Sequence, residues 1–143
     1  MQRLRTTLIL TLALSGLAVP AQACTTFLCE DGQDVLIGKS YDWHQGAGLV
    51  LVNKRGVAKK ALVLEPGATP AQWTSRYGSI TFNQYGREMP NGGMNTAGLV
   101  VEVMWLRASR YPAPDKRPTL NELQWIQYQL DRFATVKEVV EHA

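Results

Sequence analysis

The sequence predicts an α+β domain with antiparallel strands, preceded by a segment that is removed on export. Three observations lead to this prediction. Residues 1–23 have the order of a secretory signal, residues 24–105 hold short β-branched and apolar runs between turn residues, and the last 25 residues have helical spacing with capping residues. The chain of 143 residues is long enough for one domain of ordinary size and too short for two.

The composition excludes several classes of protein. With 45% hydrophobic and 19% charged residues, the chain is too apolar to be disordered. Two cysteines are too few for a disulfide-stapled scaffold or a Cys-rich zinc site. The formal net charge is +3, but removal of Arg3 and Arg5 with the signal leaves 13 basic against 12 acidic side chains. We therefore expect no nucleic-acid partner.

Residues 1–23 read as a signal peptide. A short basic start is followed by an apolar run from Thr6 to Val19, and then by small residues at Ala21 and Ala23, the two positions that determine cleavage. The apolar run is shorter than the ~20 residues that a membrane-spanning helix needs. The mature chain, residues 24–143, is therefore predicted to be periplasmic or secreted, with no membrane contact after cleavage. The alternative for this segment is an N-terminal membrane anchor.

Cleavage after Ala23 makes Cys24 the first residue of the mature chain. Its thiol is then a candidate nucleophile, and its own α-amine, with an ordinary pKa of about 7.7–8.0, is a candidate base on the same residue. Such a site requires no catalytic His, no metal and no cofactor. Two alternatives remain: lipid attachment to Cys24, although Ala21 and Gln22 fit a lipoprotein signal poorly, and a structural Cys that lies beside the cleavage site by coincidence.

The residues after Cys24 predict a β-hairpin. The first strand is predicted over 24–29, Asp31–Gly32 is a turn signal, and the strand containing 35–37 returns. This return brings Lys39 and Asp42 toward the N-terminus. Lys39 could then stabilise developing negative charge and Asp42 could hold the α-ammonium group. The alternative for these two residues is an ion pair at the surface.

Two blocks of sequence resemble the choloylglycine hydrolase family, which includes penicillin V acylases and bile salt hydrolases. The first comprises Cys24–Phe27 followed by Gly38–Trp43, and the second is Gly92–Leu99. The resemblance implies the N-terminal part of an N-terminal nucleophile (Ntn) hydrolase fold, a four-layer αββα sandwich with antiparallel sheets. It implies a small-molecule N-acyl amide as substrate. It also allows a homo-oligomer, a tetramer by analogy with the family.

The resemblance assigns roles residue by residue. Cys24 matches the nucleophile and Asp42 the carboxylate that contacts its amine. Lys39 stands where bile salt hydrolases have Arg, and Ser40 where they commonly have Asn. Trp105 falls where they place an active-site Asn, and a Trp there, together with the signal peptide, resembles the exported branch of Gram-negative bacteria. Trp43 and Trp105 are the candidate substrate-binding residues.

Further elements follow from periodicity and capping. Strands are predicted over 49–52, 61–64, 77–85 and 99–105, and a helix from Thr119 with Glu122 completing a capping box. A second cap is predicted at Thr135. Individual predictions place Lys59 and Lys60 in solvent, Trp73 as loop cover, Trp125 and Cys29 in the core, and Asn95 in a turn.

The chain ends within an apolar helical pattern, and members of the resembled family continue well beyond this point. The sequence therefore predicts a fragment with poor solubility as a monomer. Two functions remain open. The first is an exported Ntn amidase that acts on penicillin V, N-acyl homoserine lactones or conjugated bile acids. The second is a non-catalytic exported fragment or lipid-anchored binding module of the same fold.

Overall fold

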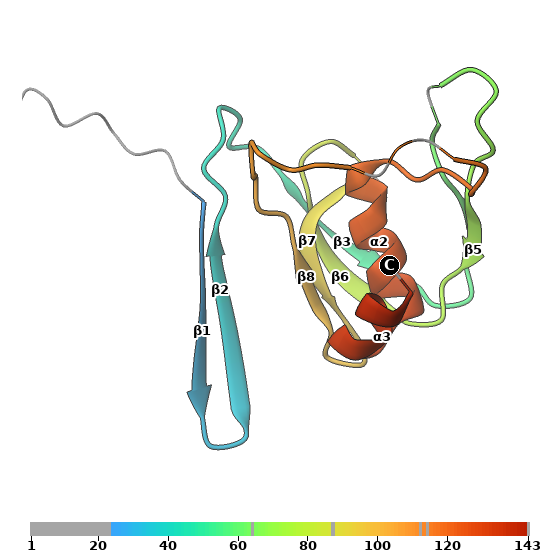
Figure 1. Cartoon of the computed structure of the whole chain (residues 1–143). Coiled ribbons are helices and arrows are strands. Elements are labelled where there is room, and N and C mark those ends of the chain that lie inside the picture. Colours follow the sequence, from blue (N-terminus) through green and yellow to red (C-terminus); the bar gives the residue numbers. More distant parts are fainter. Residues whose placement is uncertain (1–23, 64, 87, 112, 114, 143) are drawn as a thin grey trace, which may run out of the picture. The chain divides into compact units, whose positions relative to one another are not determined.

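The computed structural model describes residues 24–63, 65–86, 88–111, 113 and 115–142 (Figure 1). The predicted signal peptide, residues 1–23, lies outside the described residues. The chain divides into two compact units, one up to His44 and the other from Gln45 onward. Among the described residues, no helix has both the length and the apolar character that crossing a bilayer requires.

The first unit contains the predicted hairpin. Strands β1 (Thr25–Asp31) and β2 (Asp34–Ser40) pair antiparallel, and Gly32 adopts the positive φ of 63° in the turn between them. The two strands form a sheet by themselves, and β1 is exposed along its whole length. Cys29 is therefore exposed, and the prediction that it is buried is wrong.

Gly38 makes room for a close contact across the hairpin. It lies opposite Phe27 in the strand register, and the Phe27 ring occupies the space that a β-carbon on residue 38 would need. An aromatic ring that covers a cross-strand glycine aligns the two strands. Phe27 and Gly38 both belong to the first block of the family resemblance, so part of that block serves packing.

The second unit is built on a four-stranded antiparallel sheet with the order β3-β6-β7-β8. The strands are β3 (Leu49–Asn53), β6 (Ser79–Asn83), β7 (Pro90–Asn95) and β8 (Val100–Glu102). The strand predicted over 49–52 is confirmed in full, and the strand predicted over 77–85 is confirmed in its central part. The strand predicted over 99–105 is shorter than expected and ends at Glu102.

A second, two-stranded sheet pairs β4 (Ala58–Lys60) with β5 (Gln72–Thr74). The strand predicted over 61–64 is wrong for its described part, because the Leu62 amide donates to the Gln124 side chain at 2.6 Å instead of to a neighbouring strand. Leu64 lies outside the described residues. Trp73 is buried with Ala61 and Ala71 in a small core, so its prediction as loop cover is also wrong.

Two helices close the unit: α2 (Glu122–Arg132) and α3 (Val136–Glu141). The N-cap of α2 is Asn121, two residues after the predicted cap Thr119, because the backbone of Thr119 pairs with the Thr69–Ala71 segment. The Thr135 cap is confirmed, since its hydroxyl accepts from the Glu138 amide at 3.2 Å. Trp125 is 41% exposed, so its prediction as a core residue is wrong.

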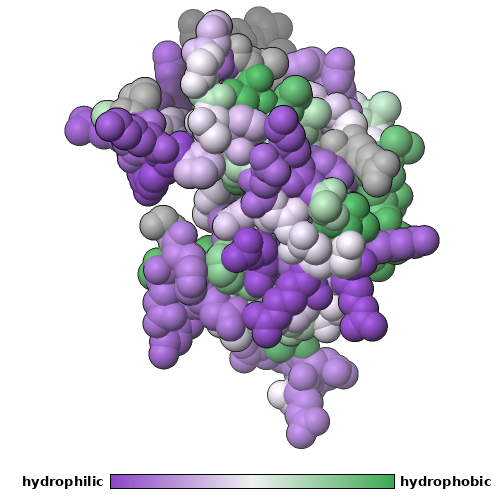
Figure 2. Space-filling model, turned by 90° about the vertical axis from the view of Figure 1, so that its right-hand side faces the viewer, coloured by the Kyte–Doolittle hydropathy of each residue, from purple (hydrophilic) through white to green (hydrophobic). Residues whose placement is uncertain are grey.

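The main sheet has one polar and one apolar face. Helix α2 packs against β7 and β8, as Figure 1 shows, and the face toward the helix carries buried Ser79 and Thr81. Alternate residues Ile80 and Phe82 point the other way and are exposed. The same open face carries Val50, opposite Phe82 in register. In the space-filling view, apolar residues gather at the top and along the right-hand side, with polar side chains between them, and polar residues predominate on the left and below (Figure 2).

Candidate active site

The hairpin brings the predicted catalytic residues of the first unit to one end. Cys24 directly precedes β1, and the register pairs Thr25 with Ser40 and Thr26 with Lys39. Asp42 follows two residues after the end of β2. The chain folds this way locally because the turn at Gly32 returns the second strand along the first. Cys24, Lys39 and Asp42 therefore come from sequence positions that the strand pairing draws together.

Ser40 links this end of β1 to the carboxylate of Asp42. Its hydroxyl accepts a hydrogen bond from the Thr25 amide at 3.1 Å and donates to Asp42 Oδ2 at 3.1 Å. Sequence reasoning assigned Ser40 only as a replacement for Asn and missed this bridge. Ser at a strand end with Asp two residues on allows such a bond, but this spacing alone does not predict one.

Aromatic rings line the segment after β2. The Lys39 ammonium lies 5.3 Å from the centre of the Tyr41 ring, a cation–π arrangement. Tyr41 and Trp43 have ring centroids 6.4 Å apart, and Trp43 and His44 have centroids 4.7 Å apart. Trp43 is 42% exposed. A partly exposed apolar surface thus adjoins the Lys39 charge, which is an arrangement that can receive an acyl group next to a polar centre.

Trp105, the other predicted substrate-binding residue, belongs to the second unit. It lies in the coil that follows β8 and is 78% exposed. Cys24 belongs to the first unit, so the predicted place of Trp105 beside it stays a prediction.

The second block of the resemblance, Gly92–Leu99, comprises the second half of β7 and the turn that leads to β8. A β-carbon on Gly93 would meet the Thr81 α-carbon at 2.9 Å, and Gly98 has a φ of +87°, so each position needs glycine for its own reason. Asn95 Oδ1 accepts from the amides of Ala97 and Leu99, each at 3.0 Å. Asn95, predicted as a turn residue, is the last residue of β7, and its carbonyl accepts from the Gly98 amide at 3.0 Å to begin the turn.

Asn95 also fastens this turn to helix α2. Its Nδ2 donates to the Leu130 carbonyl at 2.9 Å and to the Phe133 carbonyl at 2.7 Å. These carbonyls belong to the end of α2, where the last carbonyl groups lack partners within the helix. The amide side chain of Asn95, 3% exposed, therefore satisfies the helix terminus and shapes the turn.

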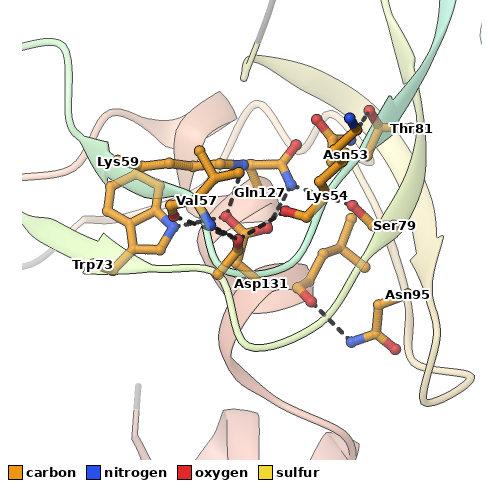
Figure 3. A network of polar contacts seen from close by, with 12 residues as sticks. Asn53, Lys54, Val57, Lys59, Trp73, Ser79, Thr81, Asn95, Gln127 and Asp131 are labelled. Carbon is orange, nitrogen blue, oxygen red and sulfur yellow. Dashed lines mark hydrogen bonds and ion pairs between the residues drawn. The ribbon is translucent and has the colours of Figure 1, made fainter.

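A buried polar cluster lies between α2 and the β4–β5 sheet (Figure 3). Asp131 forms an ion pair with Lys59 at 2.9 Å and accepts from Trp73 Nε1 at 2.7 Å and from Gln127 Nε2 at 3.0 Å. Lys59 is buried, contrary to the prediction of a solvated residue. Among the described residues, the side-chain partners of Asp131 come from β4, β5 and α2. The cluster connects structural elements, and no described group of three or more His, Cys, Asp or Glu side chains could hold a metal ion.

The antiparallel sheets and the helix that covers one of them have the fold of part of an Ntn hydrolase. A structure of penicillin V acylase from Agrobacterium tumefaciens matches 84% of this chain with a TM-score of 0.68 and 35% sequence identity. In sequence, the chain is 33% identical to a penicillin V acylase of Pectobacterium atrosepticum over 130 residues, which is 82% of this chain. No protein-family model matches the chain. By sequence and structure, the chain is a homologue of penicillin V acylases, which are choloylglycine hydrolase-like Ntn hydrolases.

The match covers only part of each relative. The chain spans 34% of the Pectobacterium protein and 37% of the Agrobacterium chain, about a third of the length of these relatives.

Proposed function

We propose that this chain belongs to an exported Ntn amidase in which Cys24, freed by cleavage after Ala23, hydrolyses a linear amide bond of a small N-acyl compound. One observation carries the proposal: the hairpin returns Ser40 and Asp42 to the end of β1 that directly follows Cys24, through the Thr25–Ser40–Asp42 hydrogen bonds. The homology with penicillin V acylases supports the same reaction class.

The proposed reaction uses the two functional groups of Cys24. The α-amine takes the thiol proton while the sulfur attacks the amide carbonyl carbon, which forms a tetrahedral oxyanion. When the C–N bond breaks, the leaving nitrogen receives that proton, and a thioester remains. The amine then takes a proton from water as its oxygen attacks the thioester, and collapse releases the carboxylic acid and regenerates the thiol.

Neighbouring residues support these steps in the proposal. The carboxylate of Asp42 holds and orients the α-ammonium form, and the Lys39 cation stabilises negative charge on sulfur or oxygen. Lys provides charge without the bidentate geometry of Arg. Trp43 and Trp105 are proposed to contact the acyl part of the substrate. Candidate substrates are penicillin V, N-acyl homoserine lactones and conjugated bile acids, and no cofactor is required by these steps.

The first experiment measures the mass of the mature N-terminus after expression of the 143-residue chain in a Gram-negative host. We expect a periplasmic or secreted chain that begins with free Cys24. A lipidated Cys24, or an active protein that retains residues 1–23, would overturn the proposal and support a lipid-anchored module or an uncut form.

The second experiment tests turnover of the processed chain with penicillin V, by release of phenoxyacetate. Cys24→Ala should abolish release, while Cys29→Ser, which changes the exposed thiol within β1, should leave it unchanged. Size-exclusion chromatography of the same sample tests the expected homo-oligomer. A folded, processed chain that releases no acid from any of the three substrate classes would favour the non-catalytic alternative.

A further inference from the structure

We propose that Ser40 is a positioning residue, which orients the Asp42 carboxylate toward the N-terminal residue through a fixed chain of hydrogen bonds. The inference rests on the proposed function, because it assigns a role within the Cys24 site. It differs from that function in being testable on the free protein, without any turnover.

The direction of both hydrogen bonds is determined by their end groups. The Thr25 amide can only donate, and an ionised Asp42 carboxylate can only accept. The Ser40 hydroxyl must therefore accept from Thr25 and donate to Asp42, and the two distances of 3.1 Å agree with this arrangement. A hydroxyl carries one proton and two lone pairs, so a single group satisfies both demands.

The location of Ser40 explains why Asp42 needs such a link. Ser40 is the last residue of β2 and is paired with Thr25, whereas Tyr41–Trp43 lies beyond the strand, outside its ladder. The backbone register therefore fixes Ser40 relative to β1 but does not by itself fix the Asp42 side chain. The Ser40 hydroxyl then holds the Asp42 carboxylate by one hydrogen bond, near the end of β1 that follows Cys24.

The chemistry of the link also says which side chains can replace Ser40. Threonine retains the hydroxyl and suits a strand end. Asparagine offers an amide oxygen that can accept from Thr25 and an NH₂ group that can donate to Asp42. Alanine can do neither. The proposal therefore predicts that Ser40→Thr and Ser40→Asn preserve the role and that Ser40→Ala removes it.

The test uses the processed chain with Cys29→Ser as background, so that Cys24 is its only thiol. We measure the rate of Cys24 alkylation by iodoacetamide and the Thr25 amide resonance by NMR. Ser40→Ala should slow alkylation about five-fold, which corresponds to the net contribution of one hydrogen bond, and should shift the Thr25 amide signal. Ser40→Thr and Ser40→Asn should remain within about two-fold of the background protein, as fits a retained hydrogen bond.

A double-mutant comparison shows whether Ser40 acts through Asp42. If it does, Ser40→Ala should have no further effect on the alkylation rate in an Asp42→Ala protein. Equal alkylation rates for Ser40→Ala and Ser40→Thr, with the remaining NMR spectrum intact, would overturn the proposal. So would an additive effect of the two alanine substitutions.

Turnover distinguishes this inference from the proposed function. If the protein hydrolyses penicillin V, Ser40→Ala should lower kcat with little change in KM, because Ser40 is not assigned to the substrate. If no turnover is found but the alkylation and NMR effects appear, the proposed function fails and the positioning role stands. Turnover that is unaffected by Ser40→Ala would overturn the positioning role alone.

Discussion

The hairpin and the second unit hold their polar side chains in opposite ways. In the hairpin, the Thr25–Ser40–Asp42 hydrogen bonds are exposed, and strand register is what brings the groups together. In the second unit, Lys59 and Asp131 are buried with partners from a strand and a helix. The candidate catalytic residues therefore lie in the hairpin, where polar contacts contribute little to stability. The polar contacts that matter for folding lie in the second unit.

The largest expected effect comes from Asp131→Ala. The substitution leaves the Lys59 charge buried without its counter-ion and removes the acceptor for Trp73, and breaking a buried pair in this way costs roughly 3–5 kcal/mol. Urea unfolding followed by tryptophan fluorescence measures the loss. Asp115→Ala, at an exposed ion pair with Arg117, is the matched control and should not move the midpoint. Similar midpoints for the two variants would contradict the structural role of the cluster.

Asn95→Ala should be the next most destabilising. It leaves the Leu130 and Phe133 carbonyls and two turn amides without their side-chain partner. A buried unsatisfied group costs about 1–3 kcal/mol, and water will reach some of these four. We therefore expect the free energy of unfolding to fall by about 2–3 kcal/mol. The adjacent Thr96 is exposed, so Thr96→Ala is the control. Equal urea midpoints for the two variants would show that the turn is not fastened to α2 by Asn95.

Gly38→Ala tests the hairpin by itself. The new β-carbon would meet the Phe27 ring, and overpacking of this kind costs roughly 1–3 kcal/mol. Faster amide hydrogen exchange in β1 and β2 measures the effect, and the urea midpoint of the second unit should stay the same. Gly46→Ala is the control, because nothing lies within 4 Å of a β-carbon at that position. A simultaneous shift of the second unit would show that the two regions are coupled.

The smallest expected effect is that of Thr135→Ala, which removes the N-cap of α3. Loss of a Thr cap costs about 1 kcal/mol, and Thr135→Ser should restore most of it. Helical content by circular dichroism and the urea midpoint measure both variants. If Ala and Ser variants behave alike, the capping hydroxyl does not stabilise the helix.

Local patterns predicted local structure well. The hairpin, the turn at Gly32 and the Thr135 cap follow from neighbouring residues, and the structure confirms them. The errors concern residues whose partners are far away in sequence. Lys59 is buried because Asp131, 72 positions later, neutralises it, and the backbone of Thr119 pairs with the Thr69–Ala71 segment, about 50 residues earlier.

The candidate site shows the same division. Its members Cys24, Lys39 and Asp42 were predicted from their order in the sequence and from the resemblance. The Ser40 link was not, because a hydroxyl that both accepts and donates leaves no periodic or compositional pattern. Whether Trp105 belongs to the site depends on the placement of one unit against the other, which no local pattern determines.

The main sheet exposes its apolar face and buries its polar face, and this arrangement affects the solubility of the protein. Phe82 and Ile80 are 55% and 49% exposed on one side of β6, whereas the opposite side buries Ser79 and Thr81. Salts such as sulfate favour the removal of apolar surface from water. We therefore expect sulfate to precipitate the folded chain without unfolding it. A charged residue in place of Phe82 should raise the sulfate concentration needed for precipitation and leave the urea midpoint unchanged.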